Sequence, residues 1–279
     1  MMRSRRMRRP PSRLRFNLSK AMFVLPNLFT VSSIFCGFYA IVLASSMRGP
    51  TALYQATQAI FFAVFFDMAD GRVARMTRTQ SEFGVQLDSL ADVISFGVAP
   101  AVIVYSWALR SLGLGGVVVA FIYIACGAIR LARFNVLAAR AQNTSGNYFI
   151  GLPIPLAAGV LASLVMVHQR TAAPVGARAT HILWLIVVLS YLMISNVRYR
   201  TFKNVKLSTT SLLSFIAGMA AFVFMAVKVE PSFACLTFFS TYVTLGLIEE
   251  VVFFRRRRKE DAHRAHPPQL PEAKKKATR

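Results

Sequence analysis

Five of the eleven acidic residues in this chain lie within one stretch of 26 residues: Asp67, Asp70, Glu82, Asp88 and Asp92. Asp67 and Asp70 are three residues apart, and Asp88 and Asp92 are four apart, so on helices each pair projects from a single face. One pair closes an apolar run and the other opens the next. A helical hairpin over these runs would therefore bring four carboxylates together at its mouth.

Neighbouring carboxylates in a poorly hydrated place repel one another unless protons or cations lie between them. Oxygen ligands without His or Cys favour a hard ion, Mg²⁺ or Mn²⁺. Such ions commonly present substrate phosphates, and two of them can clamp an in-line displacement at phosphorus. The alternative is a set of solvated loop acids that pair with Arg72, Arg75 and Arg78. We favour the metal site, because the chain has few acids elsewhere.

Small residues accompany the carboxylates at helical offsets. Gly71 directly follows the first acidic pair, Ala74 and Arg75 come one turn later, and Gly84 lies one turn before the second pair. Residues with little or no side chain let a planar or phosphorylated group approach the backbone closely. The Arg75 guanidinium offers two parallel donors to a phosphate. The pattern indicates a binding surface for a phosphorylated ligand beside the metal site.

The elements that must position these residues are apolar helices. Of the 279 residues, 55% are hydrophobic and only 16% are charged, and the apolar residues form long runs. A membrane-spanning helix needs about 20 mainly apolar residues. We therefore predict an all-α, polytopic transmembrane bundle of about eight spans, near residues 22–46, 51–69, 86–109, 112–132, 152–169, 181–197, 208–228 and 231–254.

The distribution of basic residues predicts the orientation of this bundle. The chain has 33 Lys and Arg against 11 Asp and Glu, a net charge of +22. Eight spans place 28 of the 33 basic residues on one side of the membrane, in segments 1–20, 70–85, 130–151, 198–207 and 255–279. Because basic loops stay in the cytoplasm, we predict that both termini are cytoplasmic.

The basic excess also indicates which surfaces the chain meets. We divide the chain into a basic cytoplasmic arm (1–20), a transmembrane catalytic domain (21–254) and a disordered basic cytoplasmic tail (255–279). Such segments are attracted to anionic lipid headgroups. No aromatic residues interleave the charges of the tail, so we expect no nucleic-acid partner.

Residues 67–92 read D-M-A-D-G-R-V-A-R-M-T-R-T-Q-S-E-F-G-V-Q-L-D-S-L-A-D. This segment matches the pattern D-x-x-D-G-x-x-A-R-x8-G-x3-D-x3-D at every fixed position, so the chain resembles the CDP-alcohol phosphotransferase family. The resemblance runs from about Pro26 to Pro155. The resemblance to the family also includes Pro26-Asn27-x-x-Thr30, Ser81-Glu82-Phe83-Gly84 and Asp88-Ser89-Leu90-Ala91-Asp92-x-x-Ser95-Phe96-Gly97. Two later stretches are similar to the phosphatidylserine synthase branch of that family: Arg130-Leu131-Ala132-Arg133-Phe134-Asn135 and Phe149-x-Gly151-Leu152-Pro153-x-Pro155.

This resemblance implies an enzyme that cleaves a CDP-linked substrate, releases CMP and joins the remaining phosphoryl group to an alcohol. By position, two divalent cations, Mg²⁺ or Mn²⁺, would be held by Asp67, Asp70, Asp88 and Asp92. Asp92 would also be the catalytic base. The CDP-diacylglycerol site would be formed by Asn27, Thr30, Asp67, Gly71, Ala74, Arg75 and Gly84.

The branch resemblance further implies that the substrates are CDP-diacylglycerol and L-serine. A serine site needs a cation for the carboxylate, and we expect Arg130, Arg133 and Asn135 to provide it, although Arg130 and Arg133 also fit flanking charge at a span end. Similar proteins form homodimers, so we expect a homodimer. We expect a multi-pass protein of the bacterial inner membrane with its active site facing the cytoplasm.

Two groups of alternatives remain. Other members of the family share the metal motif, so synthesis of phosphatidylglycerophosphate, phosphatidylinositol phosphate or phosphatidylcholine stays open. An ion-coupled transporter is a more distant alternative, because transporters favour acids near mid-span and a repeat that relates two halves. Here the acids lie at span ends, without a second acidic cluster inside the apolar runs.

Overall fold

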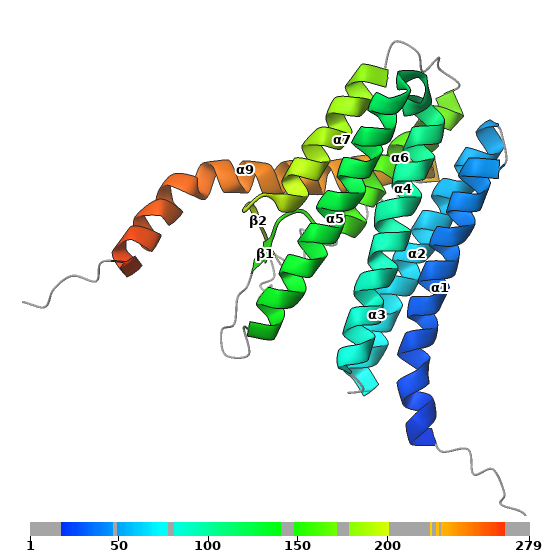
Figure 1. The fold of residues 1–279 in the computed structure, drawn as a ribbon. Coiled ribbons are helices and arrows are strands. Elements are labelled where there is room, and N and C mark those ends of the chain that lie inside the picture. The colour runs from blue at the N-terminus through cyan, green and yellow to red at the C-terminus, as the bar shows by residue number, and fades with distance from the viewer. Residues whose placement is uncertain are drawn as a thin grey trace, which may run out of the picture.

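The protein is a bundle of long helices (Figure 1). The computed structural model describes residues 18–46, 49–77, 81–140, 148–171, 179–200, 224, 227–228 and 230–265. Its α-helices are α1 (Leu18–Ser46), α2 (Pro50–Thr77), α3 (Glu82–Asp92), α4 (Ala99–Val104), α5 (Leu114–Arg140), α6 (Ile154–Thr171), α7 (Ala179–Ile194) and α9 (Pro231–Ala265).

Helices α1 and α2, the third span (α3 and α4), α5, α6 and α7 run in alternating directions, whereas α9 lies across them (Figure 1). The end of α2, the start of α3 and the end of α5 therefore lie at the same end of the bundle as the start of α1. At this end the C-terminal parts of α2 and α5 carry five arginines: Arg72, Arg75, Arg130, Arg133 and Arg140. The side of the membrane on which this end lies stays a prediction.

The number of membrane spans is only partly tested. Among the described residues, five helices are long and apolar enough to cross a membrane: Leu25–Ser46, Thr51–Thr77, Glu82–Leu112, Leu114–Ala139 and Pro231–Ile248. Helix α7 is apolar but has 16 residues, and α6 has 18. Most of the expected span 208–228 lies outside the described residues. An all-α, membrane-embedded bundle is confirmed, whereas a count of eight spans is not.

One short ladder of strands interrupts the helical pattern. Strands β1 (Tyr148–Ile150) and β2 (Arg198–Arg200) pair antiparallel. Gly151 follows β1 with a φ of +81°, a conformation that glycine adopts without steric cost. Its N–H donates to the carbonyl of Val197 at 2.8 Å, and the N–H of Leu152 donates to that of Leu192 at 3.0 Å. The ladder therefore fastens the start of α6 to the end of α7.

The third span is one continuous helical rod with irregular turns. After α3 come a π-helical segment, η1 (Val93–Val98), then α4, a second π-helical segment, η2 (Tyr105–Leu109), and a 3₁₀ turn, η3 (Arg110–Leu112). Pro100 has no N–H to donate to the carbonyl one turn earlier, so a regular α-helix is disfavoured here. Wider π turns inside helices are rare and often lie at functional sites. Here the irregular segment begins directly after Asp92.

Small residues let the helices pack closely at the centre of the bundle. Ala40 on α1 and Ala56 and Ala63 on α2 are fully buried. A Cβ atom on Gly37 would lie 2.7 Å from the Cα atom of Ser95, so α1 and η1 approach backbone to backbone. Close approach through small residues is typical of helix packing in membranes.

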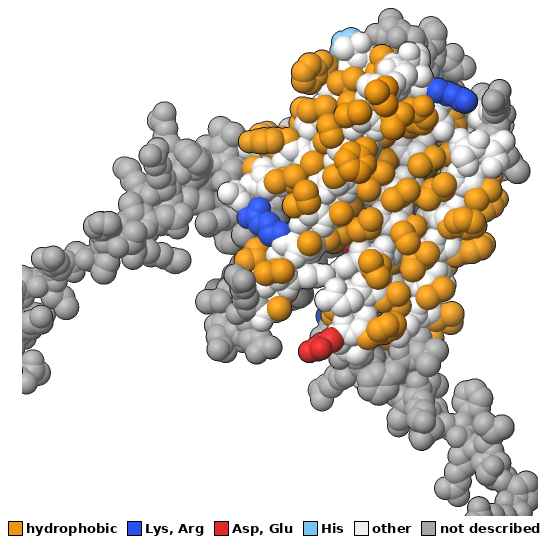
Figure 2. Space-filling view, viewed as in Figure 1, with side chains coloured by type: hydrophobic (Ala, Val, Ile, Leu, Met, Phe, Trp, Pro, Cys, Tyr) orange, Lys and Arg blue, Asp and Glu red, His pale blue; other side chains and the backbone are white. Residues whose placement is uncertain are grey.

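Large apolar side chains cover much of the outer face of the bundle (Figure 2). Exposed examples are spread over several helices: Phe35, Phe38, Phe62, Phe65, Phe121 and Trp184. Apolar surface of this extent is unusual for a protein in water and is expected where lipid tails surround the helices.

Helix α9 corrects one boundary of the sequence interpretation. The last span was expected to end at residue 254 and a disordered tail to begin at Arg255, but the helix continues to Ala265. Residues 255–265 are rich in Arg, Lys, Glu and Ala, which have high helix propensity, and the first proline comes at position 267. The arm 1–17 and the segment 266–279 lie outside the described residues.

Candidate active site

The acidic hairpin forms as the spacing predicts. Asp67 and Asp70 lie near the end of α2, and Asp88 and Asp92 lie on α3. Helix α3 begins at Glu82 because the Ser81 hydroxyl caps it and accepts a hydrogen bond of 3.0 Å from the N–H of Gly84. The short connection between α2 and α3 turns the second acidic pair back toward the first.

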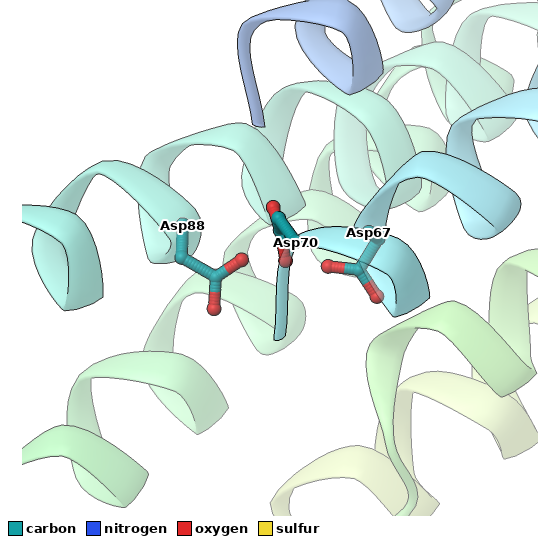
Figure 3. A group of neighbouring side chains, drawn as sticks. All are labelled: Asp67, Asp70 and Asp88. Carbon is teal, nitrogen blue, oxygen red and sulfur yellow. The ribbon is translucent and has the colours of Figure 1, made fainter. Parts of the chain in front are cut away.

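Three of the four carboxylates form one cluster. Asp67, Asp70 and Asp88 each offer an oxygen atom, and these atoms lie within 4.8 Å of one another. Figure 3 shows the three side chains reaching from α2 and α3 into the same space. Asp70 is the most buried of them, with 5% of its surface exposed. Such a cluster requires a cation or shared protons to offset the repulsion between carboxylates.

Helix α1 contributes to this cluster through Thr30. Its hydroxyl donates to Oδ2 of Asp70 at 2.8 Å and lies 3.2 Å from the carbonyl oxygen of Pro26. Thr30 is itself buried. The family resemblance implies that Thr30 lies in the substrate site, and the structure shows its hydroxyl in contact with a carboxylate of the cluster. A side chain that holds a metal ligand in place is a common feature around metal sites.

Asp92 lies beside the triad, one turn after Asp88. Its carboxyl group lies within hydrogen-bonding reach of Asp67. Its Oδ1 atom is buried and has no hydrogen-bond partner within the described part of the chain. The fourth carboxylate is therefore adjacent to the other three but retains an unused acceptor.

Arg130 faces Asp92 from α5. Only 8% of its surface is exposed, and its charge interacts with that of Asp92. Its Nε atom is buried and lacks a hydrogen-bond partner among the residues that the structure describes. A buried guanidinium with an unused donor beside a carboxylate with an unused acceptor marks a place where a polar ligand fits.

Arg133 does not join Arg130 at the aspartates. Its two terminal nitrogens donate to the carbonyl of Ile194 at 3.2 Å and to Oδ1 of Asn196 at 2.6 Å. Both arginines were expected at the serine site, but the hydrogen bonds to Ile194 and Asn196 hold Arg133 at the end of α7 instead. Arg133 therefore connects α5 to the segment that precedes β2.

Asn135 contacts the acidic hairpin directly. Its side-chain amide donates to the hydroxyl of Ser89 at 2.9 Å, and Ser89 lies between Asp88 and Asp92 on α3. Neither Ser89 nor Asn196 was selected from the sequence. Ser89 lies within a stretch that resembles the family, and its polar side chain on α3 was an available signal. Asn196 lies after the end of α7 and outside that resemblance.

The residues expected to line the nucleotide site lie along the mouth of the hairpin. A Cβ atom on Gly84 would lie 3.6 Å from Oδ1 of Asn27, so the start of α1 lies against the start of α3. A Cβ atom on Gly71 would lie 3.5 Å from a terminal nitrogen of Arg75, so this guanidinium folds back over Gly71. Ala74 lies half-buried on the same helix. Arg75 remains exposed, as a phosphate ligand at a binding surface requires.

The match to known proteins covers this whole site. Residues 23–193 match the sequence model of CDP-alcohol phosphatidyltransferases. This match spans α1 to α7 and includes every residue discussed above except Asn196 and Ile194.

The chain belongs to the CDP-alcohol phosphatidyltransferase family.

Several relatives within this family are similar over most of their length. The chain is 41% identical to a CDP-diacylglycerol–serine O-phosphatidyltransferase of Helicobacter pylori over 228 residues, which cover 81% of this chain and 91% of the relative. It is 33% identical to the enzyme of that name from Bacillus subtilis, over 66% of this chain and 93% of the relative. It is 36% identical to an archaetidylserine synthase of Methanothermobacter thermautotrophicus, over 64% and 70%.

The acidic triad fits the divalent cations that the family generally uses. The three ligands are all carboxylate oxygens, as hard cations prefer. Oxygens on opposite sides of one Mg²⁺ lie about 4 Å apart, so oxygens within 4.8 Å need only small side-chain movements to bind one ion. This membrane-embedded protein therefore has a carboxylate cluster suited to a hard cation, where its second span ends and its third span begins.

Proposed function

We propose that this protein is a CDP-diacylglycerol–serine O-phosphatidyltransferase, which makes phosphatidylserine and releases CMP. The observation that supports this most strongly is the acidic hairpin beside Arg130, in a chain 41% identical to a relative of that name. Relatives from Helicobacter pylori and Bacillus subtilis carry this name. A further relative is named archaetidylserine synthase, and its name also indicates a lipid with a serine headgroup.

The metal ligands of the proposed enzyme are Asp67, Asp70 and Asp88, with Asp92 beside them. We propose that together they hold two divalent cations, Mg²⁺ or Mn²⁺. When bound, these cations would neutralise negative charge on the diphosphate of CDP-diacylglycerol. Thr30 keeps one oxygen of Asp70 engaged at 2.8 Å and so orients the other.

Asp92 is the proposed catalytic base. An alcohol hydroxyl is a weak acid and needs a base within reach to become a good nucleophile. Asp92 takes the proton of the serine hydroxyl, and the serine oxygen bonds to the phosphorus on the lipid side. The bond from that phosphorus to the CMP oxygen breaks, and CMP leaves with the electron pair. The buried, unpartnered Oδ1 of Asp92 is a suitable acceptor for this proton.

The proposed nucleotide-lipid site extends along the mouth of the hairpin. Gly71 and Gly84 have no side chain and Ala74 has a small one, so a phosphorylated group can approach the helix backbones closely here. Arg75 is placed to bind a phosphate, and Asn27 supplies a polar side chain from α1. Diacylglycerol tails would then lie among the exposed apolar side chains of the membrane-facing surface.

Arg130 is the proposed ligand of the serine carboxylate. It is a buried cation next to the base, so one serine can reach Arg130 with its carboxylate and Asp92 with its hydroxyl. Asn135 holds Ser89 and borders the same space. We assign Arg133 to structure, because its terminal nitrogens already bind Ile194 and Asn196.

We propose that the protein lies in the bacterial inner membrane with the active site facing the cytoplasm. The arginines in the C-terminal parts of α2 and α5 lie at the same end of the bundle as the aspartates, which supports this orientation. The basic segments would bind anionic lipid headgroups there. A homodimer follows from the family resemblance and stays a prediction, which the mass of the protein in lipid nanodiscs would check.

The experiment that tests the function is an acceptor panel. Purified full-length protein is incubated with CDP-diacylglycerol, Mn²⁺ and one alcohol at a time: L-serine, glycerol 3-phosphate, inositol 1-phosphate or choline. Of the four alcohols, only L-serine is expected to cause CMP release. CMP release with a different alcohol and none with serine would replace the assigned acceptor but keep the reaction class. No release with any of them would contradict the proposed function.

A further inference from the structure

Two consecutive residues of the π-helical segment η1 are bonded to opposite neighbours. Ser95 is hydrogen-bonded to α1, and Phe96 is hydrogen-bonded to α5. Both residues are fully buried. The segment begins directly after Asp92, so its attachments lie within about one turn of the proposed base.

The attachment to α5 lies beside Pro100, which has no N–H with which to continue a regular helix. The hydroxyl of Tyr123 donates to the carbonyl of Phe96 at 3.1 Å. Tyr123 is fully buried, so this bond forms away from water. One side chain of α5 is thus bonded directly to the backbone of the third span.

The attachment to α1 involves two serines. The Ser95 hydroxyl donates to the carbonyl of Ser33 at 2.9 Å. The Ser33 hydroxyl lies 3.4 Å from that of Ser95 and 3.2 Å from the carbonyl oxygen of Ala63 on α2. The close approach of Gly37 to Ser95 leaves no space for a larger side chain between the two helices. Helices α1, α2 and η1 are therefore fastened at one level of the bundle.

Both attachments lie one or two turns from site residues on the same helices. Ala63 precedes Asp67 by four residues, and Ser95 follows Asp92 by three. Tyr123 precedes Arg130 by seven residues, which is two turns on the same helix face. A sliding movement of one helix at this level would displace the side chains at the site by a similar amount.

We propose that η1 positions the two halves of the active site through two separate hydrogen bonds, one to α1 and one to α5. Ser95 is a positioning residue for the carboxylate cluster, because it fixes α3 against α1 and α2. Tyr123 is a positioning residue for the acceptor side, because it fixes α5 against the segment that follows Asp92 and so places Arg130. The second assignment rests on the proposed role of Arg130 toward serine, whereas the first concerns the carboxylate cluster alone.

The test compares Ser95→Ala and Tyr123→Phe in the full-length protein, since each change removes one hydroxyl and keeps most of the packing. Ser190→Ala is the matched control, because Ser190 is buried and donates at 2.7 Å only within α7, to the carbonyl of Ile186. Three quantities are measured: the dissociation constant of Mn²⁺ by electron paramagnetic resonance, and the KM values for serine and CDP-diacylglycerol.

Opposite patterns are expected for the two variants. Ser95→Ala should raise the Mn²⁺ dissociation constant about threefold to tenfold and leave the serine KM within about twofold, as loss of one buried hydrogen bond allows. Tyr123→Phe should raise the serine KM about threefold to tenfold and leave Mn²⁺ binding unchanged. Ser190→Ala should change none of the three. Equal effects of all three variants, or no effect of the first two, would overturn the proposal.

A second measurement separates positioning from stability. The Tm of each variant is recorded beside its KM values. A Tyr123→Phe protein that has a lowered Tm but an unchanged serine KM would refute the positioning role of Tyr123. If the wild-type protein itself shows no serine-dependent CMP release, the proposed function fails, while the Mn²⁺ measurement on Ser95→Ala still tests the cluster.

Discussion

The hydroxyl of Thr30 lies 2.8 Å from Oδ2 of Asp70, and this bond joins the first membrane helix to a carboxylate of the second. The two residues are 40 positions apart and both are buried. The same threonine hydroxyl lies near the carbonyl of Pro26, so the bond also couples the start of α1 to the cluster. Helix α1 is therefore part of the wall that holds the carboxylates, in addition to packing beside them.

We predict that Thr30→Val weakens metal binding. Valine keeps the shape of threonine but cannot donate to Asp70, and loss of a residue that orients a metal ligand commonly costs about 10- to 100-fold in affinity or activity. Mn²⁺ binding measured by electron paramagnetic resonance checks this. Thr30→Ser should stay near the wild-type value.

A matched control for that prediction is Ser32→Ala. Ser32 also lies on α1, but its hydroxyl donates to the carbonyl of Leu28 within its own helix, at 2.8 Å. It should bind Mn²⁺ as the wild type does. If Thr30→Val instead raises the KM for CDP-diacylglycerol and leaves Mn²⁺ binding intact, Thr30 contacts the substrate, as the sequence analysis expected.

Chelation should abolish turnover. Among the described residues, Arg75 is a cation whose charge acts on Asp70, and a bound cation would supply the further compensation that the three carboxylates need. Excess EDTA should stop CMP release, and added Mg²⁺ or Mn²⁺ should restore it. Asp67→Asn, Asp70→Asn and Asp88→Asn should each lose most activity, because each removes one anionic ligand. Full activity in excess chelator would rule out the metal assignment.

Asp92→Asn should separate binding from chemistry. An amide keeps the size of the side chain but is a poor base, and general base catalysis contributes about 10²- to 10⁴-fold to rate. The variant should therefore bind CDP-diacylglycerol in an equilibrium assay while its kcat falls by that factor. A variant that no longer binds the nucleotide lipid would show that Asp92 acts mainly as a metal ligand.

The acidic hairpin was predictable because it depends on local properties of the chain. The length of an apolar run, the spacing of acids along a helix and a capping serine all act over a few residues. The connection between α2 and α3 is short, so the second pair of aspartates must return to the first.

The partners of individual side chains were not predictable in this way. The spacing of Arg130 and Arg133 permits both to face the aspartates, yet Arg133 binds residues more than 60 positions later. Which direction a side chain at a helix end takes depends on where α7 ends and how β2 is held. These are properties of the tertiary packing, and the sequence pattern around the arginines does not contain them.

The two arginines should differ when each is changed to lysine. Arg130→Lys should raise the apparent KM for serine and leave that for CDP-diacylglycerol nearly unchanged, because an ammonium does not reproduce the two parallel donors of a guanidinium. The lost charge-assisted hydrogen bond is worth roughly 1.5–3 kcal/mol, or about 10- to 100-fold in KM. Arg133→Lys should instead lower Tm, since it loosens the bonds to Ile194 and Asn196, and change the serine KM little. Equal weakening toward both substrates by Arg130→Lys would mean that this arginine holds phosphate or structure. A larger effect of Arg133→Lys on the serine KM would reverse the assignment of the two residues.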